Sequence, residues 1–360
     1  MELLITITLF AFLIWMAVVI GRQRDLFSAS MLTGIFSLIC AGLFTVMDAV
    51  DVAFTEAAVG AGISTVLFLA TLALTDERER RPEHTPLAAI GVVALTGAAL
   101  VYGTLDMPAY GDPSAPVHTG VARHYMERSW DEIGLPNIVT GVLASYRGFD
   151  TFGELGVIFT AGIGVSLLLS AGTPELTPGA PPPPPKSRAP YVREMPILRT
   201  VSKALMPYIL LFALYVQAHG DFGPGGGFQA GVIFTAALIL YGLIWGPSAV
   251  EAFARRRLVE RATAVGLLIY GGVGVTTLAL GHSFLDYSAL SPEHPQHGQH
   301  WGIFVVELGV GITVSAVMLV IYYVFASRPK KDVSPMRQPL PLLGGACVGD
   351  VSTEDAEADS

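Results

Sequence analysis

Nine separate apolar runs of about twenty residues constrain this chain more than any other feature of its sequence. A helix needs about 20 consecutive apolar residues to cross the ~30 Å hydrocarbon core of a bilayer. The runs are Leu3–Ile20, Phe27–Val46, Val52–Leu74, Leu87–Leu105, Phe152–Ser170, Leu205–Ala218, Phe228–Trp245, Thr263–Leu280 and Trp301–Phe325. The sixth run is short, and we expect its helix to begin near Ile197. The sequence therefore predicts an all-α, polytopic integral membrane protein with about nine transmembrane helices.

The composition agrees with a membrane location. Hydrophobic residues make up 52% of the chain and charged residues 14%, whereas about a quarter of a soluble domain is charged. The first run follows Met1 and Glu2 without a basic segment, so we expect a retained helix and not a cleaved signal peptide. The net charge of −9 comes partly from the acidic stretch Asp350–Ser360, and nothing supports nucleic-acid binding.

The positions of lysine and arginine predict the orientation. With the N-terminus outside, 18 of the 21 basic residues fall in inner segments, and only Arg123, Arg128 and Arg147 fall outside. Inner segments of membrane proteins carry an excess of lysine and arginine. We therefore expect the N-terminus outside and the C-terminus in the cytoplasm, in a multi-pass protein of the inner or plasma membrane.

A proline-rich stretch divides the chain between its fifth and sixth runs. Residues 172–196 contain the consecutive prolines Pro181–Pro185, and such a stretch is extended and semi-rigid. We interpret it as a cytoplasmic linker between five helices and four. Residues 328–360 are polar and end in acidic residues, so we expect a disordered tail.

A glycine-rich turn separates the sixth and seventh runs. It reads HGDFGPGGGF over residues 219–228, and Gly225, Gly226 and Gly227 permit close approaches and unusual backbone angles. Extended to HGDFGPGGGFQAGV, the segment closely resembles the signature of the B-type component of multisubunit cation/proton antiporters of the Mrp or Mnh type. The resemblance spans roughly residues 205–327.

Two further segments resemble other modules of the same complexes. DAVDVAFTEAAVGAG over residues 48–62 resembles the D-type module of these antiporters and of membrane-bound hydrogenases, and RGFDTFGE over residues 147–154 resembles their E-type module. Both also resemble the J-type component of respiratory complex I. The resemblance implies a D-like module at 1–82 with three helices, an E-like module at 83–171 with two, and a B-type module at 197–327 with four.

The same resemblance implies partners. They are the A-, C-, D-, E-, F- and G-type antiporter subunits of a hetero-oligomeric membrane complex that exchanges Na⁺ for H⁺ across the lipid bilayer.

Eight side chains are candidates for an ion route. An acidic side chain at the centre of a membrane helix costs about 2.5–3.5 kcal/mol, and such residues are usually functional. A carboxylate binds either Na⁺ or a proton, which suits an exchange site. In the predicted topology all seven acids among them lie in the outer half of a helix or at its outer boundary. The candidates are Glu56, Glu154, Glu307, Asp48, Asp51, Asp150, Asp221 and His219.

These residues also have structural interpretations. Acids at helix N-termini are stabilised by the helix dipole, which suits Asp51, Glu56 and Asp150. Asp221 and His219 can simply form the turn. The structural interpretation is favoured for the aspartates and the ion route for the glutamates.

Two glycines follow Glu56 in the third run. Gly60 and Gly62 permit either close packing of small residues or a local π-bulge. The helix of complex I that this segment resembles carries such a bulge.

An amphipathic segment precedes the fifth run. Apolar residues at i, i+4 and i+8 within residues 137–146 predict a helix on the outer surface. We expect the following Arg147 to pair with Asp150 or Glu154.

Three histidines form an HxxHxxH pattern in a predicted outer loop. They are His294, His297 and His300, and this spacing can serve zinc. The loop also contains prolines and no cysteine. We therefore expect no metal site and interpret the histidines as a polar or proton-buffering loop.

The sequence lacks the motifs of several enzyme classes. It has no P-loop, no CxxC cluster and no lysine well inside a span, so we expect no cofactor and no catalysis by the chain alone. The main hypothesis is a subunit that lines or gates the cation route of an antiporter. The alternatives are a membrane-arm subunit of a redox-driven ion-translocating complex, of the membrane-bound hydrogenase type, and a structural scaffold.

Overall fold

A computed structural model describes residues 2–72, 78–79, 87–109, 111–170 and 196–327. The predicted tail and the predicted linker, apart from Pro196, lie outside these described residues. Within the described residues the fold is helical, and nine helices are long and apolar enough to cross a membrane. The all-α, polytopic prediction is confirmed to this extent.

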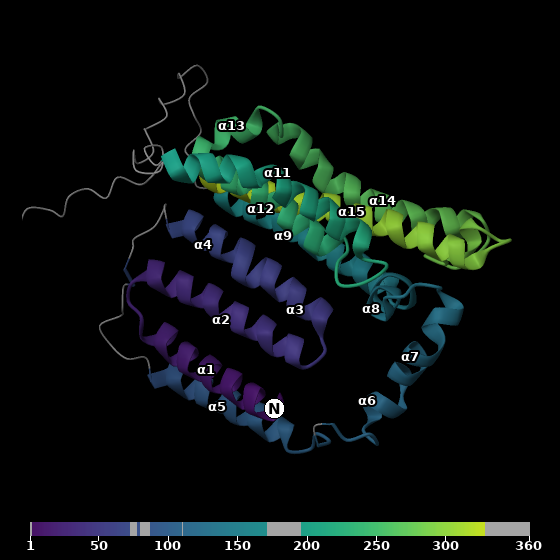
Figure 1. The fold of residues 1–360 in the computed structure, drawn as a ribbon, viewed down its shortest axis with the longest axis horizontal. Coiled ribbons are helices and arrows are strands. Elements are labelled where there is room, and N and C mark those ends of the chain that lie inside the picture. The colour runs from purple at the N-terminus through teal and green to yellow at the C-terminus, as the bar shows by residue number, and fades with distance from the viewer. Residues whose placement is uncertain (1, 73–77, 80–86, 110, 171–195, 328–360) are drawn as a thin grey trace, which may run out of the picture.

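The first three spans lie side by side in Figure 1. They begin with α1 (Glu2–Arg22) and α2 (Leu26–Val46). The third span starts as α3 (Val50–Glu56), continues as the π-helix η1 (Ala57–Ser64) and ends as α4 (Thr65–Leu72). The π conformation that the glycines permit is therefore present.

The fourth span, α5 (Leu87–Thr104), has no buried residue. A helix that is apolar all round needs lipid or protein around it. The side chains of α5 therefore depend on surroundings that the described part of this chain does not supply.

Short helices gather at one end of the long ones, the end predicted to be outside (Figure 1). They are α6 (Pro116–Thr119), α7 (Val121–Glu132), α8 (Ile138–Thr140) and the π-helix η2 (Gly141–Tyr146). The sequence did not predict α7, whereas α8 and η2 form the predicted amphipathic segment. Ile138, Val139 and Leu143 are exposed while Gly141 and Ala144 are buried, which suits a helix lying on a lipid surface.

The remaining long helices pack around α15 (Pro295–Ala326). They are α9 (Gly148–Ser170), α11 (Pro196–His219), α12 (Gly227–Trp245) and α14 (Arg256–Ala279), with the short α13 (Pro247–Glu251) and the 3₁₀ helix η3 (Tyr287–Leu290) between them. Small residues bring the helices close together. A Cβ atom at Gly266 of α14, for example, would overlap with the carbonyl of Gly309 in α15.

The helices α14 and α15 begin six or seven residues before their apolar runs. α14 starts at Arg256, and α15 starts at Pro295. Their first turns are polar, and hydropathy cannot reveal a polar helical turn. The prediction of an outer histidine loop was therefore wrong: His294 is the N-cap residue of α15, while His297 and His300 lie in its first turns.

Candidate functional site

The glycine turn between α11 and α12 lies directly against α15. Its backbone N–H at Gly226 donates to the carbonyl of Val216 at 3.1 Å. Gly226 has φ +111°, a conformation that glycine alone adopts easily. A Cβ atom at Gly227 would overlap with the carbonyl of Glu307. Glycine at these positions therefore lets the turn touch the backbone of α15.

Glu307 faces this turn from α15. A Cβ atom at Gly226 would lie 3.1 Å from Glu307 Oε1, and one at Gly220 would lie 2.9 Å from Oε2. The carboxylate thus occupies space that a larger residue in the turn would fill. It lies more than three turns into α15, on the side where α11 and α12 meet.

A histidine–aspartate pair, with the aspartate buried and the histidine partly exposed, lies beside this carboxylate. His300 Nδ1 is 2.7 Å from Asp221 Oδ2, and the side chains are 42% and 4% exposed. The other oxygen, Oδ1, has no hydrogen-bond partner among the described residues. Burial raises the pKa of Asp221 because it disfavours the charged form, and His300 opposes this shift. Asp221 is thus a carboxylate whose charge is costly at this position.

Asn137 joins the turn to the first part of the chain. Its side-chain N–H₂ donates to the carbonyls of Gly223 at 2.9 Å and Gly220 at 3.2 Å, and to Asp51 Oδ1 at 3.2 Å. The hydroxyl of Thr140 donates to the same Gly220 carbonyl at 2.7 Å. The sequence did not identify Asn137 as a site residue. The only signal in the sequence is its position directly before a helix, where asparagine is a common N-cap residue.

A second hydrogen bond links the first and last parts of the chain. The side-chain N–H₂ of Gln229 in α12 donates to the hydroxyl of Thr55 in α3 at 2.7 Å. Residues from α3, from the N-cap of α8, from the α11–α12 turn, from α12 and from α15 therefore meet in one polar group, which we call the outer junction. It consists of Asp51, Thr55, Asn137, Asp221, Gln229, His300 and Glu307.

Three predicted site residues belong to the outer junction, namely Asp51, Asp221 and Glu307. Glu56 is close along the chain but faces α2: a Cβ atom at Gly60 would lie 2.6 Å from Glu56 Oε1 and 2.5 Å from Ser37 Oγ.

The other predicted acids lie apart from the outer junction. Asp150 pairs with Arg147 at the start of α9, at 2.5 Å, with both side chains exposed. This is one of the two pairings expected for Arg147. Glu154, the other expected partner, is exposed on α9. Asp48 is exposed in the α2–α3 turn and has φ 58°.

The two remaining predictions concern histidines. The ring of His219 stacks on Tyr215, with 5.0 Å between ring centroids, and lies beside Gly223. Among the described residues no group of histidine, cysteine and acidic side chains could hold a metal ion. His300 turns to Asp221, while the rings of His294 and His297 are 5.3 Å apart.

Family models match three parts of the chain. Residues 197–320 match a domain related to the MnhB subunit of Na⁺/H⁺ antiporters. Residues 11–77 match MbhD, the D-type subunit of MBH, and residues 86–177 match MbhE, the E-type subunit of MBH.

Curated relatives agree with these matches. The chain is 26% identical over 301 residues to a probable A/B-type subunit of a K⁺/H⁺ antiporter of Rhizobium meliloti, covering 75% of this chain and 30% of that protein. It therefore spans less than a third of that relative's length. It is 32% identical over 134 residues to the putative antiporter subunit mnhB2 of Staphylococcus haemolyticus, covering 35% of this chain and 89% of that protein.

Two solved structures share the fold. A chain of the Mrp complex from Dietzia sp. DQ12-45-1b matches with a TM-score of 0.69 and 23% identity, over 91% of this chain and 35% of that chain. A chain of the membrane-bound sulfane sulfur reductase, an archaeal respiratory membrane complex, matches with a TM-score of 0.51 and 27% identity, over 67% of this chain and 97% of that chain. The protein therefore belongs to the MnhB family, and it carries MbhD-type and MbhE-type domains ahead of its MnhB-type domain on the same polypeptide.

Proposed function

We propose that this chain is a membrane subunit of a multisubunit cation/proton antiporter and lines or gates the cation route at the outer junction. The observation that carries the proposal is the placement of Glu307 and the Asp221–His300 pair against a glycine turn at the meeting point of the three modules. The antiporter names of the relatives support it. The partners would be the A-, C-, D-, E-, F- and G-type subunits.

The geometry suits exchange of a cation for a proton. His300 and Glu307 lie on one helix, about 10 Å apart along its axis, and the buried Asp221 contacts His300. The neighbouring carboxylates of Asp221 and Glu307 lie away from water, and ionising both of them together is costly. Either a proton or a bound cation relieves that cost, so each ligand would displace the other. His300, the more exposed member, would pass protons between water and Asp221.

The other acids would extend the route. Glu56 lies at the join between α3 and η1, and π-helical segments frequently occur at functional sites. Glu154 is exposed on α9, where it can face a partner subunit. We expect Gln or Ala at either position to impair exchange without loss of assembly.

The decisive test replaces Glu307 by Gln, with Glu293→Gln as the control. Glu293 is exposed before α15 and lies outside the outer junction. We expect Glu307→Gln to lower Na⁺- or K⁺-dependent proton exchange in everted vesicles at least tenfold at normal assembly, and Glu293→Gln to leave it unchanged. Normal exchange by Glu307→Gln at equal expression would disprove the role of Glu307.

A second candidate function rests on the likeness to the sulfane sulfur reductase, nearly all of whose matching chain is covered. In that case the same junction would serve a redox-driven ion-translocating complex. Affinity purification of the tagged chain separates the two. Antiporter subunits alone support the first function, and soluble redox subunits support the second.

A further inference from the structure

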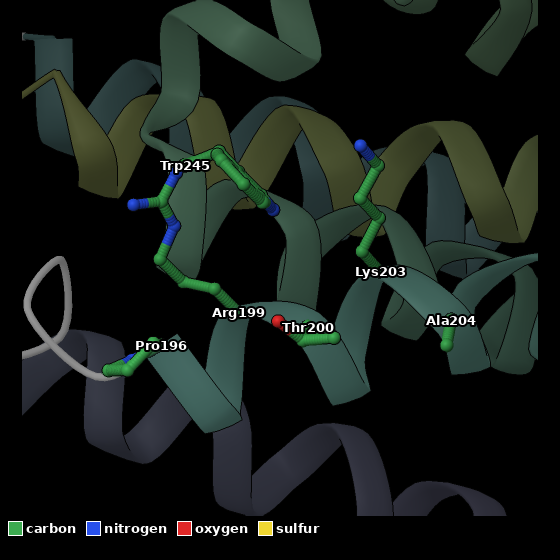
Figure 2. Close-up of a pocket in the computed structure, with 6 residues that line it drawn as sticks. All are labelled: Pro196, Arg199, Thr200, Lys203, Ala204 and Trp245. Carbon is green, nitrogen blue, oxygen red and sulfur yellow. The ribbon is translucent and has the colours of Figure 1, made fainter.

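A basic hollow lies at the opposite end of the helices from the outer junction. It has a volume of about 600 Å³ and is lined by Pro196, Arg199, Thr200, Lys203, Ala204 and Trp245. Figure 2 shows Arg199 and Lys203 extending from α11 toward the same side, with Arg199 reaching the end of α12 at Trp245. The guanidinium carbon of Arg199 lies 4.4 Å from the centroid of the Trp245 ring. That contact orients one cation at the edge of the hollow.

The charge of the hollow is not balanced by the described residues. Arg199 and Lys203 both line the hollow, and neither forms an ion pair with a carboxylate of the described residues. Two cations one helical turn apart recognise a singly or doubly charged oxyanion such as a phosphate. The hollow therefore fits an anionic phosphate group.

The level of the hollow distinguishes a lipid from a soluble anion. Arg199 is the first residue of its candidate span, and Trp245 is the last residue of the neighbouring one. Both thus lie where hydrocarbon meets the headgroup layer, the level at which tryptophan is enriched. Phosphate groups of phospholipids occupy the same level.

An apolar track continues from the hollow toward the bilayer centre. Pro207 and Leu211 follow Lys203 at intervals of four residues, so all three share one face of α11. Pro207 is exposed and Leu211 is 64% exposed. An acyl chain can lie along this face while its headgroup phosphate contacts the two cations.

We propose that this hollow, at the Arg199–Trp245 end of α11 and α12, binds the headgroup of an anionic phospholipid. Arg199 and Lys203 contact the phosphate, and the small side chain of Ala204 leaves room for the glycerol. The bound lipid would hold the adjacent ends of α11 and α12 together. Nothing in the proposed antiport function requires this site, so the two proposals stand or fall separately.

The test uses the full chain in phosphatidylcholine nanodiscs, with Trp15, Trp130 and Trp301 replaced by Phe so that Trp245 alone fluoresces. The probes are phosphatidylglycerol and phosphatidylcholine that carry a nitroxide near the headgroup. We expect the phosphatidylglycerol probe to quench Trp245 more strongly than the phosphatidylcholine probe. Arg199→Gln and Lys203→Gln should each lower this preference for phosphatidylglycerol about fivefold, because each removes one cation. Arg199→Lys should keep most of the preference, as should Arg255→Gln, which removes an exposed arginine outside the hollow.

Three outcomes would overturn the proposal. They are equal quenching by both lipids, a preference that survives the double variant, and displacement of the lipid by millimolar inorganic phosphate, which would indicate a soluble anion site. Native mass spectrometry of the unmodified chain and of the double variant checks the result without the tryptophan replacements. Phosphatidylglycerol retained equally by both would also refute it.

Discussion

Asn137 shows how one neutral side chain can hold the outer junction together. Its oxygen accepts the backbone N–H of Val139 and so caps α8, while its N–H₂ group serves three acceptors far away in sequence. Because the residue is 8% exposed, removal would leave the Gly223 carbonyl and Asp51 Oδ1 without this donor, while the Gly220 carbonyl would keep the Thr140 hydroxyl. An unsatisfied buried polar group costs about 1–3 kcal/mol.

Asn137→Ala should therefore lower the stability of the full chain by about 2–3 kcal/mol, since it removes both the cap and the donors. Asn137→Asp keeps the capping oxygen but faces a second carboxylate toward Asp51. We expect it to be at least as damaging. Thermal unfolding followed by intrinsic fluorescence measures both, and wild-type stability of Asn137→Asp would show that capping alone matters.

Gly226 has a backbone conformation that tolerates a side chain poorly. Its φ of +111° with ψ −178° is essentially confined to glycine and costs other residues about 1–3 kcal/mol. We predict that Gly226→Val prevents assembly of the complex instead of slowing an assembled one. Native gels and vesicle transport separate these cases, and an assembled but inactive variant would place the turn in the ion route.

Two substitutions serve as comparisons for Gly226→Val. Gly272→Ala is the matched control, because a Cβ at Gly272 meets nothing within 4 Å. His219→Gln should be milder than Gly226→Val if the stacked histidine is structural. It should abolish exchange if the histidine relays protons.

At this scale the sequence predicted individual candidates but not their grouping. Asp221 and Glu307 stood out because acids near membrane helices are costly. Asn137 carries no charge, and its partners are 83 and 86 positions away along the chain. Such a contact depends on how separate helices approach one another, which local patterns do not contain.

At the scale of the element, η1 links Glu56 to the packing of α2. A Cβ at Gly60 would lie 2.7 Å from Ser37 Cβ, whereas one at Gly62 would meet only the carbonyl of Ala57, at 3.5 Å. Because the two glycines lie in the same π-helix, the main difference between them is which neighbouring atoms a Cβ would contact.

Gly60→Ala should therefore force α2 and the third span apart or displace the Glu56 carboxylate, and lower exchange at least tenfold. Gly62→Ala should stay within twofold of the wild type, because 3.5 Å is an ordinary contact. Exchange in everted vesicles, normalised to expression, measures both. Equal effects of the two variants would show that the packing against Ser37 is unimportant.

Long helices were easier to predict than short ones. The apolar runs located the nine spans found among the described residues, because every run except the short sixth one matches the bilayer thickness. α7 has only 12 residues and is rich in charge, so no such length constraint applied. The amphipathic segment was predicted as a helix. The π winding of η2 was not predicted, because this winding leaves the apolar pattern of the sequence almost unchanged.

At the scale of the whole molecule, orientation stays a prediction from the charge distribution. Cysteines placed at Ser114 and at Ala252 test it, in a chain whose two native cysteines are replaced. Both positions are exposed, and they lie toward opposite ends of the long helices. A membrane-impermeant thiol reagent added to intact cells should label Ser114→Cys and not Ala252→Cys. The reverse pattern would invert the proposed topology.

The hydrogen bonds of Asn137 have a consequence for assembly. Because one polypeptide supplies both sides of this contact, the contact forms within one molecule, and the connecting chain sets its effective concentration instead of the protein concentration. It therefore needs little affinity of its own. Covalent continuity also fixes the modules at one copy each. A junction that is weak but tethered can open and close without the modules ever separating.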